Sequence, residues 1–155
     1  MANMIEGTLK LRGTRQNIEK FMSEGLGVTA IYEGKKSLSD FLINDSDEYA
    51  LEYFVRDDSI WIKGVAAYIS EGQYYTYTHR ESSILCLNIE EKWSFHSDKW
   101  LEIANKYNLD IRLYGIEKGK PFCQEVIITD GKVEQDQRWT YENWDWECPF
   151  PKMGG

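Results

Sequence analysis

The feature that most constrains the fold is the order of three patterns between residues 84 and 117. Residues 84–91 alternate apolar with other side chains, which is typical of a strand with one buried face. Residues 97–107 instead repeat apolar side chains every three or four positions, as an amphipathic helix does. Residues 109–114 alternate again. The stretch therefore predicts a strand, a helix and a strand, with the two strands parallel, either as neighbours or with another strand between them.

Capping residues predict where the central helix begins and ends. Ser97 is expected to accept a hydrogen bond from the free amides of the first turn, and Asp98 places a negative charge where the helix dipole favours it. Asn108 tolerates a left-handed backbone and is expected to end the helix. The apolar face of this helix consists of Trp100, Ile103, Ala104 and Tyr107.

The beginning of the chain repeats the order of strand and helix. Residues 5–12 predict a first strand, which Gly13 ends, and Thr14 is the expected N-cap of a helix over residues 14–24. The apolar side chains of this helix are Ile18, Phe21 and Met22. Two strand–helix halves are therefore predicted, joined by a divergent middle region, residues 26–83.

The last third of the chain predicts an additional hairpin. Residues 122–129 are rich in β-branched side chains, and Asp130-Gly131 is a favoured pair for a two-residue hairpin turn. Residues 133–138 return as a mostly polar strand, which suits the edge of a sheet.

Composition limits the class of protein. The 155 residues are expected to form a single α+β domain, residues 1–155. Three cysteines without a CxxC pair and only two histidines predict neither a disulfide framework nor a metal centre, and they suit a reducing cytoplasm. No apolar run is long enough for a secretion signal or a membrane span. The net charge of −8 disfavours direct binding to nucleic acid.

No group of residues predicts catalysis. The consecutive residues His96, Ser97 and Asp98 do not form a triad, because neighbouring side chains on a turn rarely converge on one reacting atom. Glu90 and Glu91 are adjacent on a strand and therefore point to opposite faces. We therefore expect a protein that is not an enzyme and that needs no cofactor.

Aromatic and glycine positions at both ends of the chain form a further pattern. At the start they comprise Met1-x-Asn3, the alternating strand, Gly13, and a short helix with Ile18 and Phe21. Later they comprise Trp93, Trp100, Ala104, Tyr114, Glu117, Gly119, Phe122 and the Asp130-Gly131 turn. This pattern resembles the YubB-type family of phage- and plasmid-encoded proteins, which often has Trp at the position of Met4; residues 26–83 lie outside the resemblance.

The resemblance implies a fold and a genetic origin. The implied fold is a two-layer ferredoxin-like sandwich, with a mostly antiparallel sheet and two short helices on one face, to which the C-terminal hairpin is an addition. The implied origin is a mobile genetic element. The resemblance implies no activity and no functional residues.

An acidic block is the first candidate for a binding surface. Residues 40–58 contain seven acidic side chains and one basic side chain, Arg56. Carboxylates arranged on one surface present a charge pattern that attracts a basic partner, whereas scattered carboxylates only keep a protein in solution. The candidate residues are Asp45, Asp47, Glu48, Glu52, Asp57 and Asp58.

The aromatic and acidic tail, residues 139–155, is the second candidate. Trp and Tyr dominate the energetics of protein interfaces, so this tail predicts a protein-binding segment; the alternative is that its aromatic side chains pack on the sheet. The candidate residues are Trp139, Tyr141, Trp144 and Trp146.

Together these features predict an accessory protein of a phage or plasmid that binds a host protein in the cytoplasm. In its most specific form the hypothesis is an anti-defence protein, an anti-CRISPR-like inhibitor, that presents its acidic surface to the basic surface of a nucleic-acid-binding complex. The alternative is a small-molecule or nucleotide-binding module that uses the sheet face and the Trp-rich end. The sequence predicts no oligomeric state.

Overall fold

The computed structural model describes the backbone of residues 3–29, 42–47, 50–54, 59–69, 74–78 and 83–155, and the side chains of residues 3–27, 60–69 and 84–155. Within these residues, no helix combines the length and the apolar character that crossing a membrane requires.

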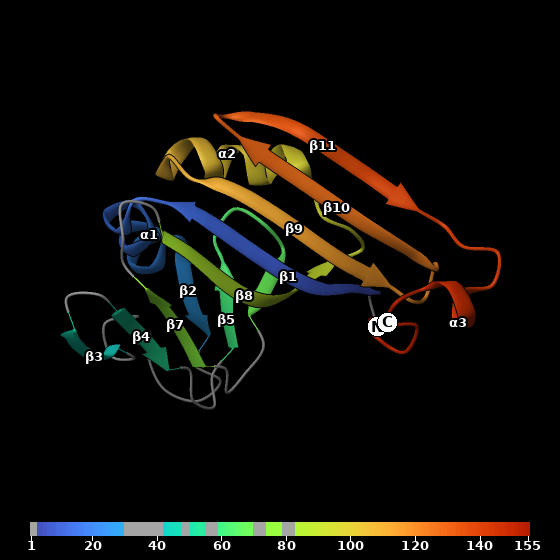
Figure 1. Cartoon of the computed structure of the whole chain (residues 1–155), viewed down its shortest axis with the longest axis horizontal. Coiled ribbons are helices and arrows are strands. Elements are labelled where there is room, and N and C mark those ends of the chain that lie inside the picture. The colour runs from blue at the N-terminus through green and yellow to red at the C-terminus, as the bar shows by residue number, and fades with distance from the viewer. Residues whose placement is uncertain (1–2, 30–41, 48–49, 55–58, 70–73, 79–82) are drawn as a thin grey trace.

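An eight-stranded sheet forms the centre of the molecule, and all of its neighbouring strands are antiparallel (Figure 1). Its strands, in spatial order, are β11 (Lys132–Trp139), β10 (Phe122–Thr129), β9 (Asp110–Glu117), β1 (Met4–Gly13), β8 (Ser83–Lys92), β6 (Ala67–Ile69), β5 (Ser59–Ile62) and β2 (Leu26–Thr29). A second, three-stranded sheet has the order β3 (Leu42–Asp47), β4 (Ala50–Phe54) and β7 (Tyr74–Thr78). The protein is therefore of the α+β class with mostly antiparallel strands.

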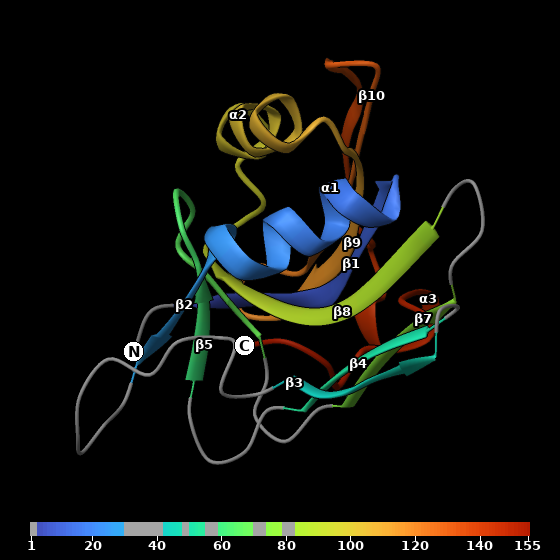
Figure 2. The ribbon, with the colours of Figure 1, turned by 90° about the vertical axis from the view of Figure 1, so that its left-hand side faces the viewer.

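Two helical segments cover one face of the large sheet. They are α1 (Arg15–Lys20), which continues into the π-helical turn η1 (Phe21–Gly25), and α2 (Ser97–Tyr107). The second sheet and the short helix α3 (Trp144–Glu147) lie towards the other face (Figure 2). The main core fills the space between the helices and the large sheet, and its largest buried side chains include Trp100, Phe21 and Phe95. Burying this apolar surface is the main favourable contribution to folding.

The two strand–helix halves match the sequence prediction. β8 and β9 are both antiparallel to β1, which lies between them, so they run parallel to one another as predicted. Thr14 caps α1, because its Oγ1 accepts a hydrogen bond from the Asn17 amide at 3.2 Å. Asn108 ends α2 in the left-handed conformation, with φ of 51°.

The predicted cap of α2 is wrong by one residue. His96 occupies the N-cap position and makes no side-chain capping bond, whereas Ser97 is the first helical residue. The Ser97 hydroxyl instead donates to Asp136 Oδ2 at 2.7 Å, on β11. The long-range hydrogen bond to the hairpin replaces the local capping bond that the sequence favours.

The C-terminal hairpin is confirmed. Asp130 and Gly131 form its turn with φ values of 49° and 69°, a conformation that favours glycine at the second position. β11 is the edge strand of the large sheet, and most of its side chains are exposed. Its polar side chains discourage edge-to-edge association.

Candidate functional site: the tail and the open face of the sheet

The acidic block is described only in part. Asp45 and Asp47 lie on β3 and Glu52 on β4, where Glu52 is opposite Asn44 and Thr76. The side chains of these three residues lie outside the described part, as do Glu48, Asp57 and Asp58 entirely. A common negative face formed by the block therefore stays a prediction.

The tail, residues 139–155, folds back onto one end of the large sheet. Ile116 and Cys123 of the sheet and Cys148 of the tail are buried where the two meet, and partly buried side chains surround them: Tyr114, Trp139, Tyr141, Trp144 and Met153. Hydrogen bonds fix its course: Trp144 Nε1 donates to the Pro151 carbonyl at 3.0 Å, and the Gly154 amide donates to Glu6 Oε2 at 3.0 Å. The tail is thus a folded part of the molecule, built on β1, β9 and β10.

The four aromatic residues predicted to bind a partner fall into two groups. Trp139, Tyr141 and Trp144 pack in the cluster between the tail and the sheet, as the alternative interpretation of the sequence proposed. Trp146 projects from α3 with 85% of its surface exposed. Asn143 caps this short helix by accepting a hydrogen bond from the Trp146 amide at 3.3 Å. The fold therefore presents one indole ring on a fixed backbone.

Two thiols and two phenols meet where the tail packs on the sheet. Cys123 Sγ and Cys148 Sγ are 3.9 Å apart, and Tyr114 and Tyr141 lie beside Cys123. Burial raises the pKa of the Cys123 thiol and of both tyrosines, so these groups stay protonated at neutral pH. A catalytic cysteine requires a thiolate, whose formation this environment opposes.

A buried carboxylate, Glu91, links β8 to α2, and its burial was not predicted from the sequence. Glu91 Oε1 accepts from the His96 amide at 3.2 Å and lies 2.7 Å from His96 Nδ1, while Oε2 accepts from Trp100 Nε1 at 2.8 Å. Burial raises the pKa of Glu91, and these hydrogen bonds oppose the shift. The alternation of β8 contained the signal, because Glu91 lies in phase with Leu87 and Ile89 and therefore on the buried face.

Gln124 fastens the loop before α2 to the hairpin. Its side chain accepts from the Phe95 amide and donates to the Phe95 carbonyl, both at 3.0 Å, and it also donates to Asp136 Oδ1 at 2.8 Å. The Phe95 ring lies over Gly115, where a Cβ atom would come within 2.6 Å of it. Because these polar groups bond to each other, the network serves to position the loop.

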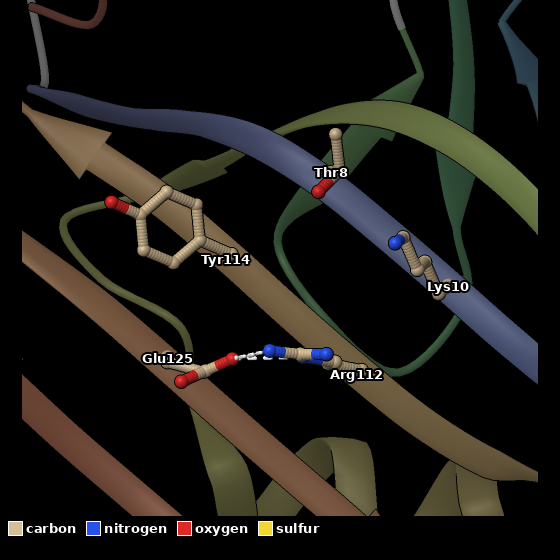
Figure 3. Close-up of a pocket in the computed structure, with 5 residues that line it drawn as sticks. All are labelled: Thr8, Lys10, Arg112, Tyr114 and Glu125. Atoms are coloured by element: carbon tan, nitrogen blue, oxygen red, sulfur yellow. Dashed lines mark hydrogen bonds and ion pairs between the residues drawn. The ribbon is translucent and has the colours of Figure 1, made fainter. Parts of the chain in front are cut away.

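A hollow of about 360 Å³ lies on the sheet face opposite the helices. It is lined by Thr8 and Lys10 on β1, Arg112 and Tyr114 on β9, and Glu125 on β10 (Figure 3). Thr8 is directly opposite Tyr114, and Lys10 is directly opposite Arg112, in the register of the two strands. Tyr114 also packs against the tail cluster, so the tail bounds this hollow on one side.

The cationic side chains of this face differ in their pairing. Arg112 Nε donates to Glu125 Oε1 at 2.8 Å, and Arg12 Nε donates to Asp110 Oδ2 at 2.9 Å. Lys10 is exposed and forms no ion pair with any side chain in the described ranges. A second hollow of about 320 Å³ adjoins the first and shares Lys10 and Arg112 with it. Two hollows therefore meet at this pair of cations.

No family model, curated protein or solved structure matches this chain. In the described part of the chain, no three His, Cys, Asp or Glu side chains are grouped closely enough to hold a metal ion.

Proposed function

We propose that this chain is a non-catalytic binding protein that docks on a basic surface of another protein, with Trp146 as its central contact. The observation that carries the proposal is the exposure of Trp146, at 85%, on a tail that is fixed by an internal hydrogen bond from Trp144 to Pro151 and by bonds from Gly154 and Gly155 to β1. An exposed indole on a rigid backbone loses little conformational freedom on binding, and Trp is enriched among the residues that dominate interface energies.

Charge around Trp146 supports a basic partner. Glu142, Asp145 and Glu147 are exposed in the same segment, and residues 139–151 contain no Lys or Arg. The whole chain carries a net charge of −8. Such a field accelerates encounter with a positively charged surface and disfavours acidic partners.

The strand order supports a ferredoxin-like fold as part of the proposal. In the segment β9-β1-β8-β6, β1 lies between β8, which precedes α2, and β9, which follows α2. The helices α1 and α2 both cover one face of this segment (Figure 2). This arrangement fits the resemblance to the YubB-type family. We extend the proposal accordingly to a protein of a phage or plasmid that blocks a nucleic-acid-binding surface of a host defence complex, as anti-CRISPR proteins do.

Capture followed by direct titration tests the proposal. The immobilised protein is expected to retain a basic nucleic-acid-binding protein from a bacterial lysate. The purified partner should then bind Trp146→Ala at least about tenfold more weakly than the wild type, because a central aromatic contact is lost. Circular dichroism should show an unchanged fold, since the ring is exposed. Ile84→Ala, which removes another exposed apolar side chain at the far end of β8, is the matched control.

Charge variants separate the two acidic surfaces. The tail is tested by a double variant, Glu142→Lys with Asp145→Lys. The acidic block is tested by a triple variant, Asp45→Lys with Asp47→Lys and Glu48→Lys. The control is Glu102→Lys on α2. Binding should weaken as salt is raised and in the tail variant, because both changes reduce the same attraction. Retention of no basic protein, or affinity unaffected by Trp146→Ala and by the tail charges, would contradict the proposal.

A further inference from the structure

Two cationic side chains lie side by side on the face of the large sheet opposite the helices. Lys10 and Arg112 are direct cross-strand partners on β1 and β9, a placement in which like charges destabilise a sheet. The chain has 26 acidic residues and 18 basic ones, yet Lys10 has no carboxylate partner in the described part of the chain. Arg112 is paired with Glu125, so the hollow is lined by two cationic side chains and one carboxylate. This position therefore carries local positive charge that a bound anion would neutralise.

We propose that the hollow lined by Thr8, Lys10, Arg112, Tyr114 and Glu125 binds a small phosphate-bearing molecule, a phosphate monoester. The proposal does not depend on the function of the tail. Lys10 and Arg112 extend over the same face of the sheet, with Thr8 and Tyr114 beside them (Figure 3). Lysine supplies a compact positive charge, arginine a planar set of donors and threonine a hydroxyl, a combination that matches the several oxygens of a phosphate.

Arg112 is oriented for this role. Its Nε and Nη2 atoms donate to Glu125 Oε1, which leaves the Nη1 side of the guanidinium without a partner in the described part. Glu125 is itself engaged, because Gln135 Nε2 donates to its Oε2 at 2.9 Å. The Glu125 carboxylate therefore holds the Arg112 guanidinium in one orientation. A side chain that is already oriented loses less conformational entropy when it binds a ligand.

The dimensions favour a small ligand over a polymer. A volume of about 360 Å³ is at the lower end of the range of small-molecule sites. The tail cluster bounds the hollow beside Tyr114. A nucleic acid strand would require a continuous cationic track, and a net charge of −8 opposes it.

Binding is measured by calorimetry and by amide chemical shifts at constant ionic strength. The probes are inorganic phosphate, glycerol 3-phosphate as a monoester, and a single-stranded oligothymidylate as a phosphodiester polymer. Chloride at the same ionic strength is the reference anion for each probe. Both small probes should bind and shift the amides of residues 8, 10, 112 and 114. Tighter binding of the oligonucleotide than of the monoester would overturn the proposal in favour of a polymer site.

Lys10→Gln provides the decisive variant, and Lys99→Gln, on the helical layer, its matched control. Lys10→Gln should raise the Kd for glycerol 3-phosphate about tenfold or more, because a charge-assisted hydrogen bond is lost. It should also raise the melting temperature of the unliganded protein, because the repulsion with Arg112 is relieved. Lys99→Gln should change neither quantity. An unchanged Kd in Lys10→Gln, or equal weakening in Lys99→Gln, would refute the site.

Discussion

Glu91 shows how a carboxylate can occupy a strand position that the alternation reserves for aliphatic side chains. Its two oxygens accept hydrogen bonds from the His96 amide and from Trp100 Nε1, and Oε1 also contacts His96 Nδ1; these contacts replace the water lost on burial. The donors belong to the first turn of α2 and the residue before it. The side chain therefore sets the position of the helix start against β8.

Stability should depend on pH through Glu91. Burial raises the folded-state pKa of Glu91 above its ordinary value of 4.5, so the folded chain holds this proton at a pH where the unfolded chain releases it. The contribution of Glu91 to the free energy of unfolding therefore falls as pH rises from 4.5 through the raised pKa. In Glu91→Gln this fall should be absent, because glutamine does not titrate.

Urea unfolding at several values between roughly pH 4 and 7 measures the effect. Glu90→Gln is the matched control, since its side chain is on the opposite face and should leave the wild-type pH dependence intact. Identical pH dependence in wild type and Glu91→Gln would show that Glu91 titrates alike in the folded and unfolded chains.

At the scale of elements, the tail is held to the sheet by packing around Cys123 and Cys148. Their sulfur atoms are 3.9 Å apart, so a small movement brings them to bonding distance. Oxidised glutathione should convert the two thiols into one disulfide and be reduced to two molecules of glutathione. The raised pKa of Cys123 predicts a slow reaction at neutral pH that accelerates as pH rises, because the thiolate is the reacting form.

The crosslink should stabilise the fold, because it closes a loop between residues 25 apart and thereby restricts the unfolded chain. The expected gain is about 3 kcal/mol. Peptide mapping without reductant identifies the bond, and thermal unfolding measures its effect. The measurement uses Cys86→Ser, which removes the exposed third thiol. A Cys123–Cys148 bond that lowers the melting temperature would mean that the tail must be distorted to form it.

The elements that the sequence predicted best are those set by local pattern. The β1–α1 and β8–α2–β9 units follow from side-chain periodicity, and the Asp130-Gly131 turn follows from the backbone preferences of two residues. The cap of α2 was misassigned because Ser97 bonds to Asp136, which is 39 positions away and cannot be identified by local reasoning.

At the scale of the whole molecule, the sites depend on which strands become neighbours. Lys10 and Arg112 come from β1 and β9, so no local pattern shows that they meet. The four tail aromatics were indistinguishable in sequence because each is an aromatic residue among acids. Only the course of the backbone exposes Trp146 and packs Trp139, Tyr141 and Trp144 against the sheet.

The C-terminal residue lies beside the start of β1, because the Gly155 amide donates to the Met4 carbonyl at 3.3 Å. A covalent ring could therefore be closed here by a short flexible linker. Opening that ring between Asp130 and Gly131 would create new ends at an exposed hairpin, where few contacts are lost. This circular permutant should fold with nearly the wild-type melting temperature, as circular dichroism would measure. A permutant that fails to fold would mean that the original connectivity of the chain, and not only the final set of contacts, governs how this chain reaches its structure.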